Sequence, residues 1–393
     1  MKIIPNIEPI YDTFPDNYIN DIRGWGIDKE TIIKEKGKLL TLDIDFGSYC
    51  SLNCPGCFRK SNKADKVKNE LDYDDLVKLI LEAKTLGLKQ VKFLGAGEPQ
   101  ENGRFLEFIR FLKSENIISM QFTKGQVIGD NNKVKEYFGE YGITTGKELV
   151  EELYKNDVSI TLGFNSFDDK IQGKMVGQNK EFIHIRNKAL ELLVEAGFNT
   201  TNPTRLGLGV NPVTNWNIHE AFDIYKWGRL RNMYVVVTPT MVSGRAGDDS
   251  WKYITPPAQD IMELYRKIND FNIQTNLQKK NFILDNGISA YAGGHVCNQV
   301  SCGMYVTLNG VVLRCPGSDT AVEGNIWDNT LTEIWNKSLN KNTLSGVYNT
   351  RCIAKDGKSI PKELYKKVEK SLLKGITSFE NIAYKKSVDL LIK

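Results

Sequence analysis

Cysteine and histidine are scarce in this chain of 393 residues. Its seven cysteines fall into two distant groups, and its three histidines, His184, His219 and His295, are scattered. An odd number of cysteines in separated groups argues against a disulfide framework, and clustered cysteines in a reducing compartment are more often metal ligands or catalysts. The cysteines are therefore the first place to look for chemistry, and the histidines do not form a metal-site pattern.

Long apolar runs and an excess of charge are also missing. No stretch of eighteen apolar residues is present, and the sequence from Met1 to Pro5 lacks the apolar centre of a signal peptide. A net charge of +4 gives no nucleic-acid footprint. We expect a cytoplasmic protein with no nucleic-acid partner and no membrane partner, and the length favours roughly two to three domains.

A repeated pattern of short apolar run, turn and amphipathic helix begins near residue 39. Such units with nearly continuous apolar strands are typical of a parallel sheet covered by helices. Six strands are too few for a closed eight-stranded barrel, so we predict an α/β fold with a partial (β/α)6 TIM-like barrel and a functional site at the carboxyl ends of its strands. The expected strands are 39–46, 90–94, 117–123, 158–164, 205–210 and 234–238.

The pattern also predicts how the chain is divided. We expect an irregular N-terminal arm over 1–38, the barrel over 39–246, a small domain of a β-hairpin and helices over 247–360, and a Lys-rich helical tail over 361–393. The polar connection over 125–145 is long for a compact domain, and it is interpreted as either a substrate lid or a surface insertion.

Three cysteines, Cys50, Cys54 and Cys57, follow the first expected strand within eight residues. On a short loop with Gly and Pro, three thiolates can converge on one inorganic centre and leave one coordination position open. Structural zinc usually takes a fourth ligand, and none lies close by, whereas an iron–sulfur cluster tolerates three cysteines. Both metals remain possible on the residues alone, and the cluster is favoured.

The CxxxCxxC loop after the first strand resembles the radical S-adenosylmethionine (SAM) superfamily. That resemblance implies a [4Fe–4S] cluster held by Cys50, Cys54 and Cys57, with SAM bound at the open iron. In place of the aromatic residue that often precedes the third cysteine the chain has Gly56, and Phe58 follows instead. Strand-end motifs complete the resemblance and imply these cofactor-binding residues: Phe58, Gly95, Ala96, Gly97, Glu98, Pro99, Thr123, Asn165 and Asn211.

A second group of cysteines surrounds an expected hairpin. Asn309-Gly310 between two alternating runs is a strong two-residue turn signal, which would make Cys302 and Cys315 neighbours. Cys297 and Cys352 lie on either side, so the four can share a metal. The spacing resembles the SPASM/twitch extension of the same superfamily, which implies an auxiliary [4Fe–4S] cluster; a zinc knuckle and buried free thiols are the alternatives.

The resemblance implies that SAM is cleaved to a 5′-deoxyadenosyl radical that takes a hydrogen atom from the substrate. The substrate is then oxidised or crosslinked, with the auxiliary cluster accepting an electron. We expect a peptide or small polar metabolite as substrate and flavodoxin or ferredoxin as electron donor.

The alternatives are a dehydrogenase or epimerase of a sugar or aminocyclitol, and a non-catalytic iron–sulfur carrier or zinc-stabilised binding module. Epimerisation is disfavoured because two clusters use all seven cysteines. The sequence names no catalytic base.

Overall fold

One open sheet organises the molecule. The computed structural model describes residues 1–59, 70–247, 251–343 and 352–374, and within them nine strands pair in the order β6-β5-β4-β3-β2-β1-β7-β8-β9. The strands are β1 (Thr41–Ile44), β2 (Gln90–Phe93), β3 (Ile118–Thr123), β4 (Ser159–Gly163), β5 (Leu206–Val213), β6 (Tyr234–Pro239), β7 (Gly303–Val306), β8 (Val311–Leu313) and β9 (Val322–Asn325). The six strands expected in the barrel are confirmed.

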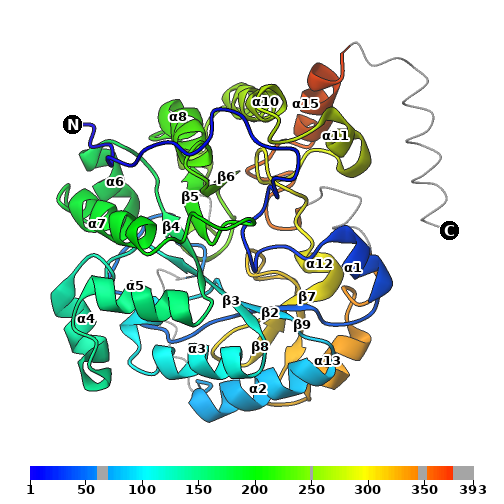
Figure 1. Ribbon diagram of the computed structural model, residues 1–393. Coiled ribbons are helices and arrows are strands. Elements are labelled where there is room, and N and C mark those ends of the chain that lie inside the picture. The colour runs from blue at the N-terminus through cyan, green and yellow to red at the C-terminus, as the bar shows by residue number, and fades with distance from the viewer. Residues whose placement is uncertain (60–69, 248–250, 344–351, 375–393) are drawn as a thin grey trace.

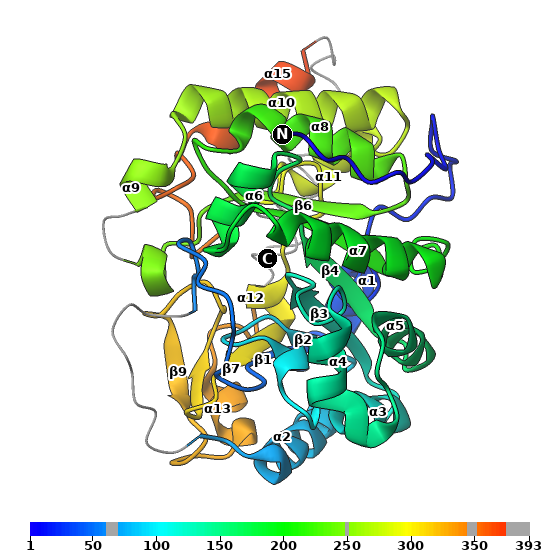
Figure 2. The ribbon, with the colours of Figure 1, turned by 90° about the vertical axis from the view of Figure 1, so that its left-hand side faces the viewer.

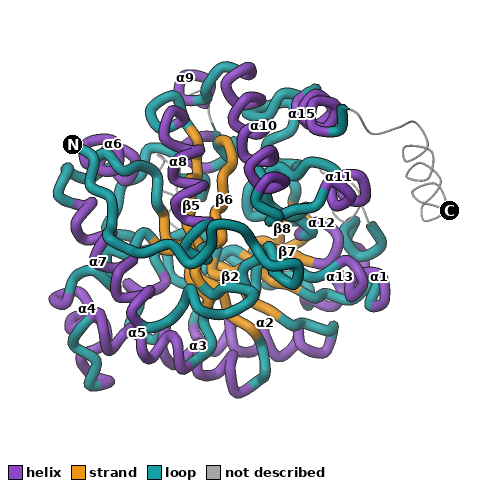
Figure 3. The backbone as a smooth tube through the Cα atoms, turned by 45° about the horizontal axis from the view of Figure 1, so that its top comes forward, coloured by secondary structure: helices purple, strands orange, loops and turns teal. Residues whose placement is uncertain are grey.

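The strands from β1 to β7 run parallel, and only the pairings of β8 with β7 and with β9 are antiparallel. β1 and β2 are buried along their whole length, as expected of strands that are covered on both faces. Because the sheet is curved but not closed, the prediction of a partial barrel is also confirmed (Figure 3).

Helices cover the outer face of the curved sheet (Figure 1). Capping boxes at Asp72 and Thr145 begin two of them, where a side chain accepts from the third backbone amide of the helix. The helices are α1 (Lys29–Lys34), α2 (Tyr73–Thr85), α3 (Phe105–Ser114), α4 (Asn131–Phe138), α5 (Gly146–Lys155), α6 (Asp169–Val176), α7 (Phe182–Glu195), α8 (Ile218–Arg229), α9 (Trp251–Ile254), α10 (Ala258–Gln274), α11 (Lys280–Asn286), α12 (Gln299–Cys302), α13 (Leu331–Lys337) and α15 (Leu364–Leu372).

The N-terminal arm closes the amino ends of the strands. Ile22 forms a bridge with Thr204 just before β5, and the side chain of Gln90 at the start of β2 donates to the Trp25 carbonyl. Ile22 and Trp25 belong to an apolar cluster inside the barrel with Met120 and Val236. The arm, which the sequence predicts to be irregular, contains helix α1 and fills the barrel interior from the amino ends of the strands.

The C-terminal hairpin extends the barrel sheet. β7 pairs with β1 from Thr41↔Gly303 onward, so the barrel and the hairpin are one continuous sheet (Figure 2). The predicted two-residue turn is wrong in detail, because Thr307 N donates to Val311 O around a longer loop in which Gly310 has φ +79° and Asn309 does not have a positive φ. A loop of this kind takes its left-handed residue only at the last position.

The connection over 125–145 is not a loop. It contains α4, whose Val134 and Phe138 are fully buried in the main core, and this favours the surface insertion over the lid. At the other end of the chain, α15 lies within the predicted tail, and residues 375–393 lie outside the described residues. No helix in the described part of the chain has the length and apolar character needed to cross a membrane.

Candidate active site

A cavity of about 160 Å³ opens at the carboxyl ends of the barrel strands. All three cysteines of the first group line it, together with residues that follow β2, β3, β4, β5 and β6. The lining residues are Cys50, Cys54, Gly56, Cys57, Phe58, Phe93, Leu94, Gly95, Gly97, Glu98, Pro99, Phe122, Thr123, Lys124, Thr161, Gly163, Met175, Gly209, Asn211, Pro212 and Met241.

Most of the residues predicted to bind a cofactor lie on this wall: Phe58, Gly95, Gly97, Glu98, Pro99, Thr123 and Asn211. Ala96 and Asn165 do not line it. Lys124 and Met241 do, and the prediction omitted both. They directly follow β3 and β6, so the strand-end rule alone could have identified them.

The cysteine loop is fastened to the loop after β2. The backbone amide of Glu98 donates to the Tyr49 carbonyl at 2.8 Å. Gly97 has φ +78°, and a Cβ there would lie 2.1 Å from the Gly47 carbonyl oxygen. The two loops therefore approach each other so closely that this position requires glycine, which gives the small residues of the Gly95–Pro99 motif a structural reason.

An ion pair with a buried carboxylate holds the other side of the same loop. Glu101 accepts from the backbone amide of Ser51 at 2.7 Å and from its hydroxyl. Lys133, on α4, lies 2.7 Å from Glu101 and donates to the Ser51 hydroxyl at 3.0 Å. The segment first considered as a lid thus supports the cysteine loop from outside the cavity.

The last barrel loop closes over the cysteines. Arg245 donates to the Cys54 carbonyl at 2.8 Å through its guanidinium and to the Cys57 carbonyl at 2.9 Å through its backbone amide. A Cβ on Gly244, whose φ is +56°, would meet the backbone of Phe58 at 2.4 Å. These contacts fix the backbone around Cys54 and Cys57 without using their side chains.

Glu98 is the buried carboxylate of the cavity. It accepts from Thr123 Oγ1 and Gln121 Nε2, both at 2.8 Å, and from the backbone amide of Gln100. Burial raises the pKa of Glu98 to about 7, and these hydrogen bonds only partly oppose the effect. An ammonium group bound in the cavity would favour the ionised form.

Burial also raises the pKa values of the first thiols. The pKa of Cys50 rises to about 12, mainly through burial and then through the Glu98 charge, and the pKa of Cys54 rises despite the Lys124 charge. Iron binding must therefore displace protons from them. Among the described residues no three His, Cys, Asp or Glu side chains meet at one point as a single metal ion would require. A cluster binds each cysteine through a different iron, so its ligands need not meet in this way.

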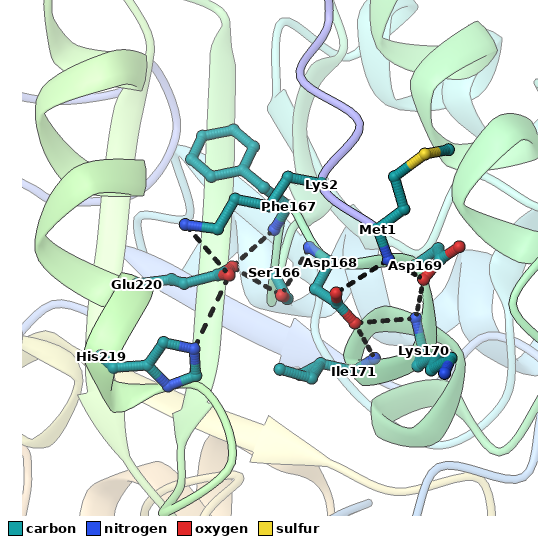
Figure 4. A network of polar contacts seen from close by, with 10 residues as sticks. All are labelled: Met1, Lys2, Ser166, Phe167, Asp168, Asp169, Lys170, Ile171, His219 and Glu220. Carbon is teal, nitrogen blue, oxygen red and sulfur yellow. Dashed lines mark hydrogen bonds and ion pairs between the residues drawn. The ribbon is translucent and has the colours of Figure 1, made fainter.

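Polar side chains of the segment after β4 are bonded to neighbouring segments of the protein (Figure 4). Glu220 accepts from the Ser166 hydroxyl and the Phe167 amide at 2.6 and 2.8 Å, and Asp168 caps α6 and binds the Met1 ammonium at 3.0 Å. Asn165 is 1% exposed, and neither polar atom of its side chain has a hydrogen-bond partner within the described ranges. Its contact with a cofactor stays a prediction.

Lys124 occupies the space beside Gly163. A Cβ at Gly163 would lie 2.6 Å from the Lys124 ammonium, so glycine at this strand end gives the lysine its room. The Lys124 side chain thus fills the space that a side chain at position 163 would need.

The second cysteine group adjoins a smaller cavity of about 20 Å³. Cys297 and Cys315 line it, and Leu94 and Met241 belong to the walls of both cavities. Burial raises the pKa of Tyr291, and the neighbouring thiols of Cys297, Cys352 and Cys315 add to that effect. Tyr291 lines the small cavity together with Cys297 and Cys315.

Cys302 faces different neighbours. Its thiol donates to the Asn298 carbonyl at 3.5 Å, and its side chain packs with Ile32 and Leu40. The hairpin forms as predicted, but of its two cysteines only Cys315 lines the small cavity. The role of Cys302 as a ligand remains a prediction.

A buried ion pair lies on the wall between the two cysteine groups. Lys92 on β2 lies 3.2 Å from Asp43 on β1 and donates to Gln299 on α12 at 3.0 Å. Burial raises the pKa of Asp43 to about 6, and the Lys92 charge opposes this rise. The pair ties the barrel strands to the helix that carries Cys302.

Comparison with known proteins gives one family match. A family model described as the Radical SAM superfamily matches residues 44–222. A 7,8-dihydro-6-hydroxymethylpterin dimethyltransferase of Methanocaldococcus jannaschii is 26% identical over 168 residues, which is 42% of this chain and 29% of that protein. A tungsten-containing aldehyde ferredoxin oxidoreductase cofactor-modifying protein of Pyrococcus furiosus is 29% identical over 90 residues, 23% of this chain and 25% of that protein. The chain thus spans less than a third of the length of either relative.

Two solved structures share the fold. Native anSMEcpe with bound AdoMet and Kp18Cys peptide is 16% identical with a TM-score of 0.58, covering 88% of this chain and 99% of that chain. Streptococcus suis SuiB bound to precursor peptide SuiA is 15% identical with a TM-score of 0.53, covering 83% of this chain and 79% of that chain. At these identities the likeness concerns the fold.

Proposed function

We propose that this chain is a radical SAM enzyme that uses SAM to oxidise or crosslink a peptide or a small polar metabolite, as the match of residues 44–222 to the Radical SAM superfamily supports. The observation that carries the proposal is the single cavity that joins Cys50, Cys54 and Cys57 to the ends of five strands. A [4Fe–4S] cluster and SAM are the cofactors that the superfamily implies.

The three cysteines would hold the cluster, and the residues around them would hold SAM. When bound, the cluster supplies the electron that splits SAM into methionine and a 5′-deoxyadenosyl radical. Glu98 supplies a buried negative charge for the methionyl ammonium, and the apolar side chains of Leu94, Phe122 and Met241 keep water from the reacting atoms. Arg245 and Glu101 keep the cysteine loop in place from outside.

The oxidising step is assigned to the second cysteine group. Cys297, Cys302, Cys315 and Cys352 would hold an auxiliary [4Fe–4S] cluster, whose chemistry is to accept one electron. Together with removal of a hydrogen atom by the deoxyadenosyl radical, acceptance of one electron at this group would make the net reaction a two-electron oxidation of the substrate, and the accompanying proton would leave to water. Support comes from Leu94 and Met241, which line both cavities and so place them next to each other.

The proposed substrate class comes from two proteins that share the fold. SuiB and anSMEcpe were each solved with a peptide, and this makes a peptide the first substrate to test. A flavodoxin or ferredoxin would deliver the electron, and a cytoplasmic location stays a prediction. A sugar or aminocyclitol substrate is the alternative outcome of the same assay, and an inert protein would indicate an electron carrier or a binding module.

Anaerobic reconstitution tests the proposal. With iron, sulfide and dithionite we expect about eight irons per chain, since each [4Fe–4S] cluster holds four, and formation of 5′-deoxyadenosine from SAM. Cys57→Ala should abolish cleavage, whereas Cys315→Ala should leave cleavage and stop turnover. A fully loaded, reduced wild-type protein that forms no deoxyadenosine would exclude the radical reaction, and normal turnover by Cys315→Ala would exclude the auxiliary acceptor.

A further inference from the structure

Lys355 is a fully buried cation. Its side chain is 0% exposed, and its ammonium has no hydrogen-bond partner in the part of the chain that the structure describes. It stands over the ring of Tyr291, 4.8 Å from the ring centroid. Burial of a charged ammonium is costly unless an opposite charge lies close, and a cation–π contact alone compensates only in part.

Cysteines of the second group lie near Lys355. Tyr291, over whose ring the Lys355 ammonium stands, lines the small cavity together with Cys297 and Cys315. The Lys355 ammonium also opposes the effect of burial on the pKa values of both thiols. No ion pair joins Lys355 to a carboxylate among the described residues. Neutral thiols would leave this cation uncompensated, whereas thiolates bound to metal would not.

One turn delivers both Cys352 and Lys355. The Lys355 amide donates to the Cys352 carbonyl at 3.2 Å, and the Cys352 amide donates to Asp356 at 2.8 Å. Asp356 also accepts from the Tyr365 hydroxyl at 2.6 Å, which anchors the turn to α15. The position of the lysine relative to the cysteine is therefore set by backbone geometry.

We propose that Lys355 is the internal counter-charge of the metal–thiolate centre held by the second cysteine group, and that it raises the reduction potential of that centre. This inference rests on the proposed function, which places an electron acceptor there. One-electron reduction adds one negative charge and breaks no bond, so a fixed cation stabilises the reduced state more than the oxidised state. Lys355 would act as a positioning residue that makes the centre a better acceptor.

The test is a reduction titration followed by electron paramagnetic resonance. The full chain carries Cys50→Ala, Cys54→Ala and Cys57→Ala, so that only the second centre contributes a signal. In this background Lys355→Met removes the charge at similar length, Lys355→Arg keeps it, and Lys358→Met removes an exposed charge from the same turn.

We expect Lys355→Met to lower the ratio of reduced to oxidised centre about tenfold at a fixed potential, a shift of about 59 mV for one electron. The Arg and Lys358 variants should titrate like the parent. Loss of iron in the Met variant with retention in the Arg variant would also support the counter-charge, because the charge would then be needed for assembly.

Equal potentials in the parent and a fully loaded Met variant would overturn the inference, and so would loss of iron in both Lys355 variants. A second centre that binds zinc or no metal would overturn both the inference and the auxiliary acceptor. Deoxyadenosine formation, measured in parallel on protein with Cys50, Cys54 and Cys57 intact, reports separately on SAM cleavage.

Discussion

Glu98 shows how a single residue of the cavity can affect the stability of the chain. Within the described residues its carboxylate accepts hydrogen bonds only from neutral donors, and it is 4% exposed. Its pKa of about 7 in the folded protein exceeds the ordinary value of 4.5. Between these pH values the folded protein holds a proton that the unfolded chain releases, so this residue's contribution to stability falls as the pH rises.

Replacement of Glu98 should remove that dependence. The difference between 4.5 and about 7 corresponds to about 3 kcal/mol, lost by the wild type as the pH rises from 4.5 past 7. We expect Glu98→Gln, measured by urea unfolding of metal-free protein at pH 5 and pH 8, to lose less stability than wild type by up to this amount. Exposed Glu151→Gln is the control, and parallel pH profiles for Glu98→Gln and wild type would refute the assignment.

At the scale of elements, α4 acts as a brace for the cysteine loop. Only two apolar residues, Val134 and Phe138, anchor the helix in the core, and its polar side presents Lys133 to Glu101 and Ser51. The Glu101 side chain is completely buried, and Lys133 is its ion-pair partner. A surface insertion thereby supports the loop that carries Cys50, Cys54 and Cys57.

Loss of Lys133 should weaken the loop more than the fold. Lys133→Met leaves the Glu101 carboxylate with hydrogen bonds to Ser51 only, which we expect to cost about 1 to 3 kcal/mol because the lysine is partly exposed. The measurement is the rate at which the protein incorporates the first four irons, which we expect to be slower in Lys133→Met. Lys135→Met, on the exposed side of the same helix, is the matched control. Equal rates of loading in both variants would show that the brace is dispensable.

At the scale of the whole molecule, the barrel and the hairpin region share one core. Leu42 and Ile44 of β1, Met304 and Val306 of β7 and Trp335 of α13 belong to the same apolar cluster. β1 is hydrogen-bonded to β2 on one side and β7 on the other. Residues beyond 246 are therefore part of the barrel's own sheet and core.

A chain that ends at Gly247 should not fold into a stable barrel. It would expose the pairing edge of β1 together with the apolar residues that β7 and α13 cover, and exposed edges of this kind favour aggregation. We expect this fragment to aggregate or to lack near-ultraviolet circular dichroism. A monomeric fragment with cooperative thermal unfolding would show that the barrel is independent.

The sequence predicted what local patterns determine. Buried runs such as Gln90–Phe93 identify the strands, and the spacing of Cys50, Cys54 and Cys57 identifies the site. The helix α4 was missed because its sequence is mostly polar and only Val134 and Phe138 face the core. The environment of the Lys355 side chain could not be predicted from the neighbouring sequence, because the thiols and the ring near it belong to segments that are distant in sequence.

The shared strand β1 has a kinetic consequence. The first cysteine loop follows the carboxyl end of β1. Just before its amino end, the backbone amide of Leu40 donates to the Cys302 carbonyl at 2.8 Å, and this hydrogen bond restrains hinge motion between the two cysteine groups. The separation between the two proposed redox sites is then set by a hydrogen-bonded strand rather than by domain closure. The rate of electron transfer between the two sites should accordingly be insensitive to solvent viscosity. Binding of the substrate alone would then complete the electron-transfer path.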